Sequence, residues 1–374
     1  MMSKRILNFI KREIVLVAAC VAALISMFFV RPSEKYIQYI DFPVLAILFC
    51  LMLVVAGFIK SKLFDVVSSK ILKTTHDIKI VSIILVNILF FSAMLITNDV
   101  ALITFVPLTI ALLGTKHQNQ LIYVIVMETI AANLGSMITP IGNPHNLYLY
   151  SYYHMNILDF FKILLPVVVL SYLLIMLTMV IRKIEPIYLV QEATPHIENK
   201  LNLTIYLIIF VLCILTVLRI LDYRICLVIT ATTIFAIDKK LFKKVDFSLL
   251  ATFIAFFIFV GNMSNIYIVK NMVSKFINGK ELLSGILFSQ VISNVPTAIM
   301  LSGFTKNVKE LLVGVNIGGL GTIVASLASL ISYKLYVKNE NSNIKKYIIV
   351  FTVFNFAFLF ILTAMYLLLH NWRI

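Results

Sequence analysis

Charged residues are scarce in this sequence of 374 residues. Asp, Glu, Lys and Arg together make up 13% of the chain, whereas hydrophobic residues make up 61%. Soluble domains usually carry about 25% charged residues. No segment between the apolar stretches is long or polar enough to form a separate soluble domain. The composition therefore excludes a soluble globule and predicts an all-α membrane protein that crosses the bilayer many times.

Cysteine is also rare, and the motifs of several enzyme classes are missing. The four cysteines lie inside apolar runs without a paired spacing: Cys20, Cys50, Cys213 and Cys226. This excludes a disulfide framework and a structural metal cluster. The chain has no His-Glu-x-x-His, Gly-x-Ser-x-Gly or Gly-x-x-x-x-Gly-Lys-Ser/Thr motif. We therefore expect neither an intramembrane enzyme nor ATP hydrolysis by this chain, and a separate ATPase partner stays open. Rings of charge typical of a channel filter are not visible.

Acidic residues are the scarcer charge. The chain has 17 Asp and Glu against 32 Lys and Arg, a formal net charge of +15. The basic residues fall between apolar segments, where the positive-inside tendency and anionic lipid account for them, so we expect no nucleic-acid partner. With the N-terminus in the cytoplasm, about two thirds of the Lys and Arg residues fall on cytoplasmic segments. We expect a multi-pass protein of the plasma (cell inner) membrane with its C-terminus outside.

The apolar stretches predict about nine crossings and two helical hairpins, at about 20 residues per crossing. Crossings are expected near residues 14–30, 42–59, 120–145, 157–181, 201–218, 225–237, 247–263, 308–333 and 345–369. Two further stretches, 78–114 and 281–304, are interrupted by polar residues at 97–99 and 293–297. Each of these is predicted to be a re-entrant hairpin that enters and leaves the membrane on one side.

The stretch from Glu128 to Asn146 places a polar, helix-breaking run inside an apolar crossing. The polar and helix-breaking residues arrive within a dozen positions: Asn133, Gly135, Ser136, Thr139, Pro140, Gly142, Asn143 and Pro144. In a bilayer, non-helical backbone is tolerated only where it is buried in protein or lines a watery cavity. The cut ends of the helix carry about half a charge each, so a break at this depth is suited to binding an ion. The pattern predicts a broken helix at 120–145 and indicates transport.

The two halves of the chain repeat this pattern. Asn133, Gly135 and Thr139 align with Asn316, Gly318 and Thr322. The hairpin tips also align, Thr97-Asn98 with Ser293-Asn294. An odd number of crossings separates the copies, so the second must run through the membrane upside down. The predicted division is a first inverted repeat at 1–182, a linker and connecting span at 183–218, and a second inverted repeat at 219–374.

Four polar clusters carry a resemblance to a known family: TNDVALITFVP (97–107), NLGSMITPIGNPHN (133–146), SNVPTAIMLSGF (293–304) and NIGGLGTIVAS (316–326). The chain resembles the ion transporter superfamily, which includes arsenite permeases, NhaD-type sodium/proton antiporters, citrate transporters and sodium-coupled dicarboxylate carriers. The likeness covers nearly the whole length. It implies two inverted repeats that work as an elevator, often in a homodimer. His145 departs from the neutral amide expected between Pro144 and Asn146, and Val295 follows Ser293-Asn294 where the dicarboxylate branch has Thr.

The resemblance implies that the hairpin tips and the facing loops line the substrate and cation sites. The expected binding residues are Thr97, Asn98, Asp99, Asn133, Gly135, Ser136, Thr139, Gly142, Asn143, Asn146, Ser293, Asn294, Thr297, Asn316, Gly318, Gly319 and Thr322. Lys and Arg are absent from both loops, so an anion would be held by helix N-termini and by Asn, Ser and Thr donors. No cofactor or structural metal is expected.

Asp99 and Glu128 are the acidic residues placed most clearly inside spans of the first half. An ionisable group there costs roughly 2.5–3.5 kcal/mol unless it faces partners or water, so both are candidates for coupling to a cation. Their matched positions in the second half are Val295 and Leu311. Asp99 could instead cap a helix that starts at Val100, which does not exclude ion binding.

The leading hypothesis is a secondary active transporter that moves a small inorganic or organic anion through the lipid bilayer, coupled to H⁺ or Na⁺. The alternative is a sodium/proton antiporter of the NhaD type, favoured if Asp99 binds the cation and no anion is needed. The sequence leaves the substrate and the coupling ion open.

Overall fold

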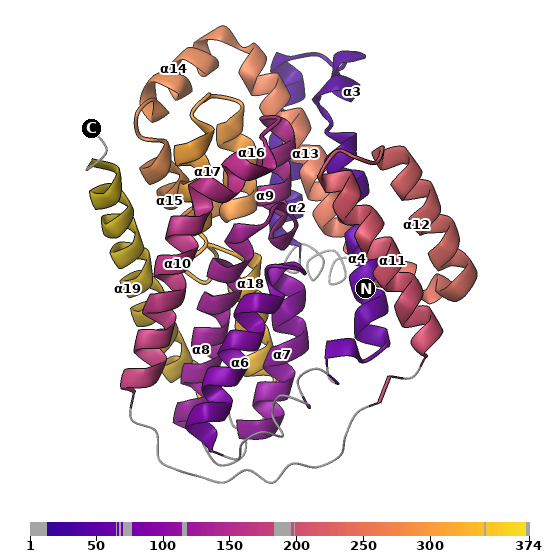
Figure 1. The fold of residues 1–374 in the computed structure, drawn as a ribbon. Helices are drawn as coiled ribbons and strands as arrows, with labels where there is room; N and C mark the ends of the chain where they lie inside the picture. Colours follow the sequence, from indigo (N-terminus) through magenta and orange to yellow (C-terminus); the bar gives the residue numbers. More distant parts are fainter. Residues whose placement is uncertain are drawn as a thin grey trace, which may run out of the picture.

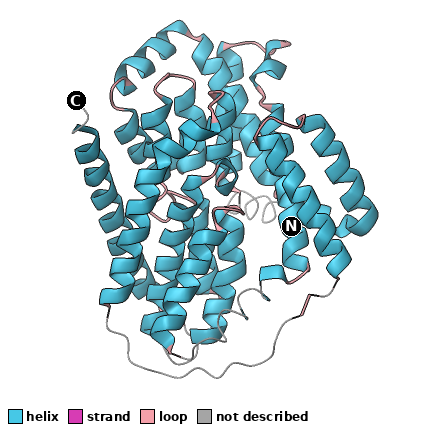
Figure 2. Cartoon of the chain, in the orientation of Figure 1, coloured by secondary structure: helices cyan, strands magenta, loops and turns pink. Residues whose placement is uncertain are grey.

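The computed structural model describes residues 13–64, 66, 69, 77–113, 118–182, 196–197, 199–339 and 342–371. Every long element in these ranges is a helix (Figures 1 and 2). The helices are α2 (Ile14–Phe29), α3 (Lys35–Tyr39), α4 (Phe42–Lys60), α6 (Ile78–Ser92), α7 (Asn98–Leu113), α8 (Gln118–Gly135), α9 (Pro144–Tyr152), α10 (Ile157–Ile181), α11 (Lys200–Val217), α12 (Tyr223–Asp238), α13 (Phe247–Asn265), α14 (Tyr267–Ile277), α15 (Glu281–Ile292), α16 (Asn294–Ser302), α17 (Val308–Ile317), α18 (Leu327–Val337) and α19 (Ile344–Asn371). Short 3-10 turns lie at Ser136–Ile138, Pro140–Gly142 and Lys239–Lys244.

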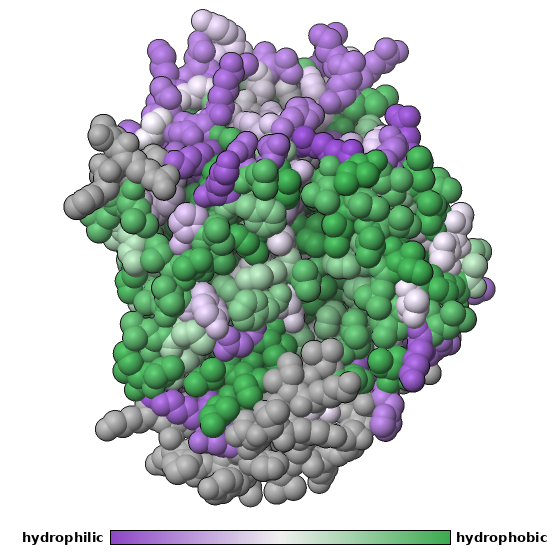
Figure 3. Space-filling model, viewed as in Figure 1, coloured by the Kyte–Doolittle hydropathy of each residue, from purple (hydrophilic) through white to green (hydrophobic). Residues whose placement is uncertain are grey.

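The helices form a polytopic membrane protein, as the composition predicts. Among the described residues, six apolar helices are long enough to cross a bilayer. They are Phe42–Lys60, Gln118–Ile138, Ile157–Ile181, Lys200–Val217, Phe247–Asn265 and Ile344–Leu369. Large apolar side chains are exposed on the shorter helices and on all of these six except Gln118–Ile138, which is buried in the bundle. On the face shown in Figure 3 they form a belt below a hydrophilic cap over α3 and α14. Such a belt is the surface that contacts lipid.

The remaining predicted crossings also coincide with helices, which are shorter than a full span. α2 and α12 have 16 residues each, and the crossing predicted at 308–333 consists of α17 and α18 with non-helical backbone at 318–326 between them. Several helices begin at an Asp whose carboxylate accepts a backbone N–H of the first turn, including α4 at Asp41 and α13 at Asp246. This capping satisfies N–H groups that have no partner inside the helix.

Both hairpins are present and enter from opposite sides. In Figure 1 α6 and α7 rise from the lower side and turn in the middle of the molecule, whereas α15 and α16 descend from the upper side and turn at the same level. Ser293, at the second turn, has φ of 76°, in a region that non-glycine residues rarely adopt. Together with the two broken helices, this arrangement is the inverted repeat expected from the sequence.

The break between α8 and α9 forms where the sequence predicts it. Gly135 ends α8 against α6, and a Cβ there would lie 2.2 Å from the backbone oxygen of Phe90. Thr139 accepts a hydrogen bond from the N–H of Gly142 and donates one to the carbonyl of Met94. Pro144 then opens α9, a position where its missing N–H costs nothing. Glycine and threonine thus fix the loop against the first hairpin tip.

The helices pack as two bundles. α13 lies along α2, and α4 lies along α11 and α12. The hairpins and broken helices make the other bundle: α6 and α7 pack on α8, α18 on α7, and α15 on α17. The first bundle is called the flanking bundle and the second the hairpin bundle below. Residues 183–195, within the predicted linker, lie outside the described residues, so the division at 182 and 219 stays a prediction.

Candidate functional site

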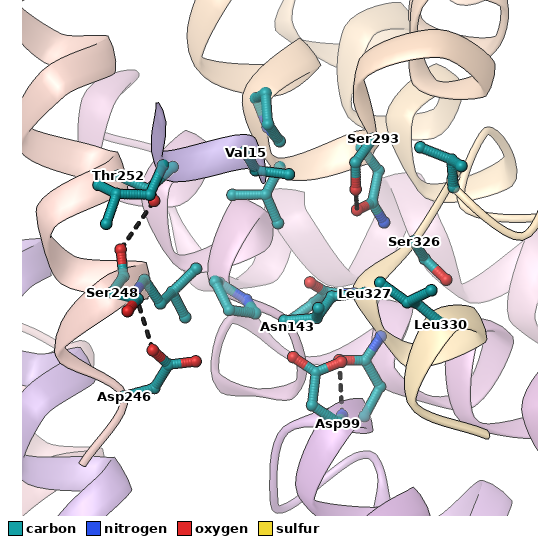
Figure 4. Close-up of a pocket in the computed structure, with 18 of the residues that line it drawn as sticks. Val15, Asp99, Asn143, Asp246, Ser248, Thr252, Ser293, Ser326, Leu327 and Leu330 are labelled. Atoms are coloured by element: carbon teal, nitrogen blue, oxygen red, sulfur yellow. Dashed lines mark hydrogen bonds between the residues drawn. The ribbon is translucent and has the colours of Figure 1, made fainter. Parts of the chain in front are cut away.

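The tips of the two hairpins share one cavity at the centre of the molecule (Figure 4). Its volume is about 290 Å³. Both tips and both helix breaks supply its polar lining, which includes Asn98, Asp99, Asn143, Ser293, Asn294 and Ser326. A second cavity of about 640 Å³ shares Asp99, Pro144 and Asp246 with the first and is also lined by Lys60, Lys240 and Lys244. We call these the central cavity and the basic vestibule.

Four helices begin at the central cavity. The first residues of α7, α9, α16 and α18 are Asn98, Pro144, Asn294 and Leu327, and all four line it. The first N–H groups of a helix have no partner inside the helix, and the helix dipole adds a partial positive charge there. The four helix ends therefore contribute N–H donors and partial positive charge to a cavity that is also lined by the charged side chains of Glu13, Asp99, Asp246 and Lys334.

Asn133 joins the first hairpin to the second repeat. Its side-chain oxygen accepts from Nδ2 of Asn98 at 3.1 Å. Its own Nδ2 lies 3.1 Å from Oγ of Ser326, 3.4 Å from Oγ of Ser329 and 3.4 Å from the carbonyl of Gly319. All of these side chains are buried. The amide of one broken helix is therefore satisfied by the break in the other.

The matched residue Asn316 makes the reciprocal connection. Its Nδ2 donates to Oδ1 of Asn146 at 2.7 Å and to the carbonyl of Leu312 at 2.8 Å. Asn146 in turn donates to the carbonyls of Ser136, Met137 and Thr139, which lie in the first break. The two breaks are thus held to each other by a pair of crossed asparagine contacts.

The second hairpin tip is fixed by backbone and by Gln290. The N–H of Asn294 donates to the carbonyl of Ala325 at 2.9 Å. Nε2 of Gln290 donates to the carbonyls of Gly318 and Leu320, each at 2.9 Å, and its Oε1 accepts from the N–H of Thr322 at 2.9 Å. Thr322 also donates through Oγ1 to the carbonyl of Gln290. These contacts tie the strained tip to the non-helical loop at 318–326.

Asn143 has an unpaired amide at the cavity. It is 3% exposed, precedes α9 and lines the cavity, yet its side chain makes no cap and no hydrogen bond to a described residue. Because it lines the cavity, this carboxamide is left to hydrogen-bond with water or a ligand there. Asn143 is therefore the side chain most clearly left to contact a ligand.

Asp99 lies in the first turn of α7, and the side chain of Asn98 accepts its N–H at 2.9 Å. The alternative that Asp99 caps a helix beginning at Val100 is therefore wrong, since α7 starts one residue before Asp99. Within the described part of the chain no residue donates a hydrogen bond to its carboxylate. Asp246, at the start of α13, lines both cavities with it.

Glu128 lies away from both cavities. It is fully buried on α8, where Thr109 donates to its Oε1 at 2.5 Å, and its Oε2 has no partner among the described residues. His145 is also fully buried, beside the side chain of Asn316. These two groups belong to the interior of the hairpin bundle.

The other predicted residues lie near the central cavity but do not line it. Thr97 lines the basic vestibule, Thr297 donates to the carbonyl of Ser293 inside α16, and a Cβ on Gly319 would lie 2.9 Å from the amide nitrogen of Asn294. Gly318 accepts from Gln290 through its carbonyl, and Ser136 donates to the carbonyl of Asn133. Their roles in binding remain predictions.

Three polar residues of the site were not predicted from the sequence. Gln290 had a signal, because it is an isolated amide in an apolar run three residues before Ser293. Ser329 lies just beyond the recognised cluster at 316–326. From the sequence, Asp246 is expected to cap a helix, and the residues next to it in the chain do not indicate that it lines a cavity with Asp99. Its position depends on how the two bundles pack.

Comparison with known proteins is consistent with this architecture. Residues 5–310 match the family model described as citrate transporter. An uncharacterized transporter of Methanocaldococcus jannaschii is 31% identical over 337 residues, covering 90% of this chain and 92% of the relative. The inner membrane protein YbiR of Escherichia coli is 30% identical over 322 residues, covering 83% of this chain and 84% of the relative.

Proposed function

This chain belongs to the citrate transporter family, and we propose on that basis that it is a secondary active transporter of a small anion, coupled to H⁺ or Na⁺. The observation that carries the proposal is the convergence of four helix N-termini on one central cavity. An anion bound there needs no Lys or Arg in the loops, because backbone N–H groups and the Asn143 and Asn294 amides can donate to it.

Asp99 is the first candidate for the coupling residue. Its carboxylate lines the cavity beside the proposed anion site, so a cation bound to it would offset the charge of the anion. Glu128 is the second candidate, and it would act as a buried proton carrier because it reaches neither cavity. With Asp99 as the coupling residue, cation and anion favour each other in the same cavity, which couples their movement.

The two bundles support an elevator mechanism. The hairpin bundle contains both tips and both breaks, held together by the crossed asparagine contacts of Asn133 and Asn316. Such a unit can move as one body past the flanking bundle, carrying the cavity from one side of the membrane to the other. We further propose the plasma membrane as the location, with the N-terminus in the cytoplasm and the C-terminus outside, and a homodimer as the assembly.

A sodium/proton antiporter is the second candidate function. Two carboxylates, Asp99 and Asp246, line the central cavity, and a cation could be the only ion carried. The two functions differ in whether an external anion is required for cation flux.

The test is uptake by the purified protein in liposomes. A panel of radiolabelled anions, including citrate, phosphate, sulfate and arsenite, is offered under an inward pH gradient and, separately, an inward Na⁺ gradient. Anion transport predicts that at least one anion accumulates above its equilibrium level and that the gradient ion enters only with it. Gradient-driven Na⁺/H⁺ exchange that is unaffected by every anion would contradict anion transport and favour the antiporter.

A further inference from the structure

Asp246 lies at the junction of the two bundles and of the two cavities. It begins α13 in the flanking bundle, where its Oδ1 accepts from the N–H of Leu249 at 2.9 Å. Asp99 lies in the first turn of α7 in the hairpin bundle. Both residues line the central cavity and the basic vestibule, and Figure 4 shows both among the residues around the central cavity. A fixed carboxylate and a carboxylate of the proposed moving unit therefore share one space.

The other charged side chains of the central cavity do not neutralise Asp99 and Asp246. The other charged side chains that line the central cavity are Glu13 and Lys334, which are of opposite sign. In the basic vestibule, Lys60 is paired with Asp238 at 2.5 Å, while Lys240 and Lys244 lie on the lining. Asp246 is exposed and Asp99 is half-buried. Two like charges that share a cavity repel each other, and a cation held between them removes that repulsion.

Neutral oxygen ligands are present at the same place. Asn143 is 3% exposed, faces the cavity and has no hydrogen bond to a described residue, so its carbonyl oxygen is available to a cation. Ser248 and Ser293 also line this cavity. Carboxylate, amide and hydroxyl oxygens are the ligands that hard cations prefer.

We propose that Asp99 and Asp246 hold one coupling cation between them, with the Asn143 amide as a neutral ligand, in this conformation of the protein. The site takes a single positive charge, either Na⁺ or a proton, because both neutralise the same repulsion. Movement of the hairpin bundle separates the two aspartates, and the cation site is then lost. Asp246 is therefore a ligand of the coupling cation, and the inference rests on the proposed function of Asp99.

The test measures cation binding without transport. Thermal unfolding of the full chain in lipid nanodiscs is followed along a Na⁺ series at constant ionic strength and pH, with choline as the replacement, and along a pH series without Na⁺. One of the two series should raise the Tm of the parent protein along a saturating curve. Asp246→Asn keeps the cap of α13 and removes the charge, and it should weaken the apparent affinity by about tenfold or more.

Asp41→Asn is the matched control. Asp41 caps α4 as Asp246 caps α13, accepting from Val44 through Oδ1 and from Ser151 through Oδ2, but it lines neither cavity. This variant should retain the cation curve of the parent. Asp246→Ser, which also retains a cap, replaces Asp246→Asn if the latter does not fold.

A cation curve in the Asp246 variants that superimposes on the parent curve would overturn the proposal, as would a parent Tm that responds to neither Na⁺ nor pH. A weakened curve supports the site even if no anion is taken up, in which case anion transport alone fails. Normal uptake together with an unchanged curve in the Asp246 variants would leave the proposed function standing and remove this site.

Discussion

The two hairpin tips have the same position in the fold and different chemistry. Asn98 and Asn294 each begin a helix at the central cavity, one from each side of the membrane. Behind the first tip the next residue is Asp99, and behind the second it is Val295, followed by Pro296. The two inverted repeats thus place the same kind of helix end at the cavity. They differ in the next residue, which is an acid only at the first tip. This difference is the reason we propose that the cation binds at the first tip and that both tips bind the anion.

Removing either asparagine should have the largest effect on transport. Asn98→Ala removes the donor to Asn133, and Asn294→Ala removes an amide from the cavity. We expect anion uptake in liposomes to fall at least about 100-fold in each case, because ligands must be held within a fraction of an ångström. Expression and Tm should change little. Near-normal uptake by both variants would show that the paired asparagines only pack.

Asp99→Asn should abolish coupling to the cation gradient and leave movement of the anion across the membrane intact. The amide keeps the shape and removes the charge, so accumulation driven by a pH or Na⁺ gradient should be lost while exchange of labelled for unlabelled anion continues. Val295→Asn, the same residue at the second tip, should change accumulation less than about twofold. If Asp99→Asn accumulates the anion as strongly as the parent, coupling belongs to Glu128 or to backbone groups.

The glycine at the end of each broken helix tests how tightly the two repeats are packed. Gly135→Ala places a Cβ 2.2 Å from the backbone oxygen of Phe90, which cannot move without shifting α6. In Gly318→Ala the nearest atoms are the carbonyl of Gly314 at 2.8 Å and Cβ of Ser289 at 2.9 Å. We expect a destabilisation of about 1–3 kcal/mol for Gly135→Ala and less for Gly318→Ala. Equal or reversed losses of Tm would contradict this difference.

Glu128→Gln should have the smallest effect on transport if Asp99 carries the coupling cation. The Gln side chain has the same shape and can still accept from Thr109, as Oε1 of Glu128 does. Anion uptake and its pH dependence should remain within about twofold of the parent, since Glu128 reaches neither cavity. A loss of pH-driven accumulation as complete as in Asp99→Asn would move proton coupling from the first tip into the interior of α8.

Much of this arrangement could be predicted because it depends on short stretches of sequence. Polar runs inside apolar segments gave both hairpin tips and both helix breaks, since backbone at that depth needs partners. The matched Asn133 and Asn316 gave the inverted repeat. Contacts between distant segments could not be read in this way. The pairing of Asn133 with Ser326 and the placement of Asp246 opposite Asp99 depend on the packing of whole helices.

One local pattern gave an error. Asp99 was a plausible cap for a helix at Val100, but the preceding Asn98 begins the helix and accepts the N–H of Asp99. The error concerns one or two residues at a helix start, which propensity does not resolve.

Binding of an anion to the purified protein tests the central claim most directly. Tm is measured for the parent and for Asn294→Ala against the same panel of anions, with and without Na⁺ and at two pH values. A ligand at about 100 times its dissociation constant stabilises by about 2.7 kcal/mol. The account predicts that at least one anion raises the Tm of the parent, that the coupling cation strengthens this effect, and that Asn294→Ala loses it. A stabilisation that is the same in Asn294→Ala and independent of the cation would contradict an anion site shared by the two hairpin tips.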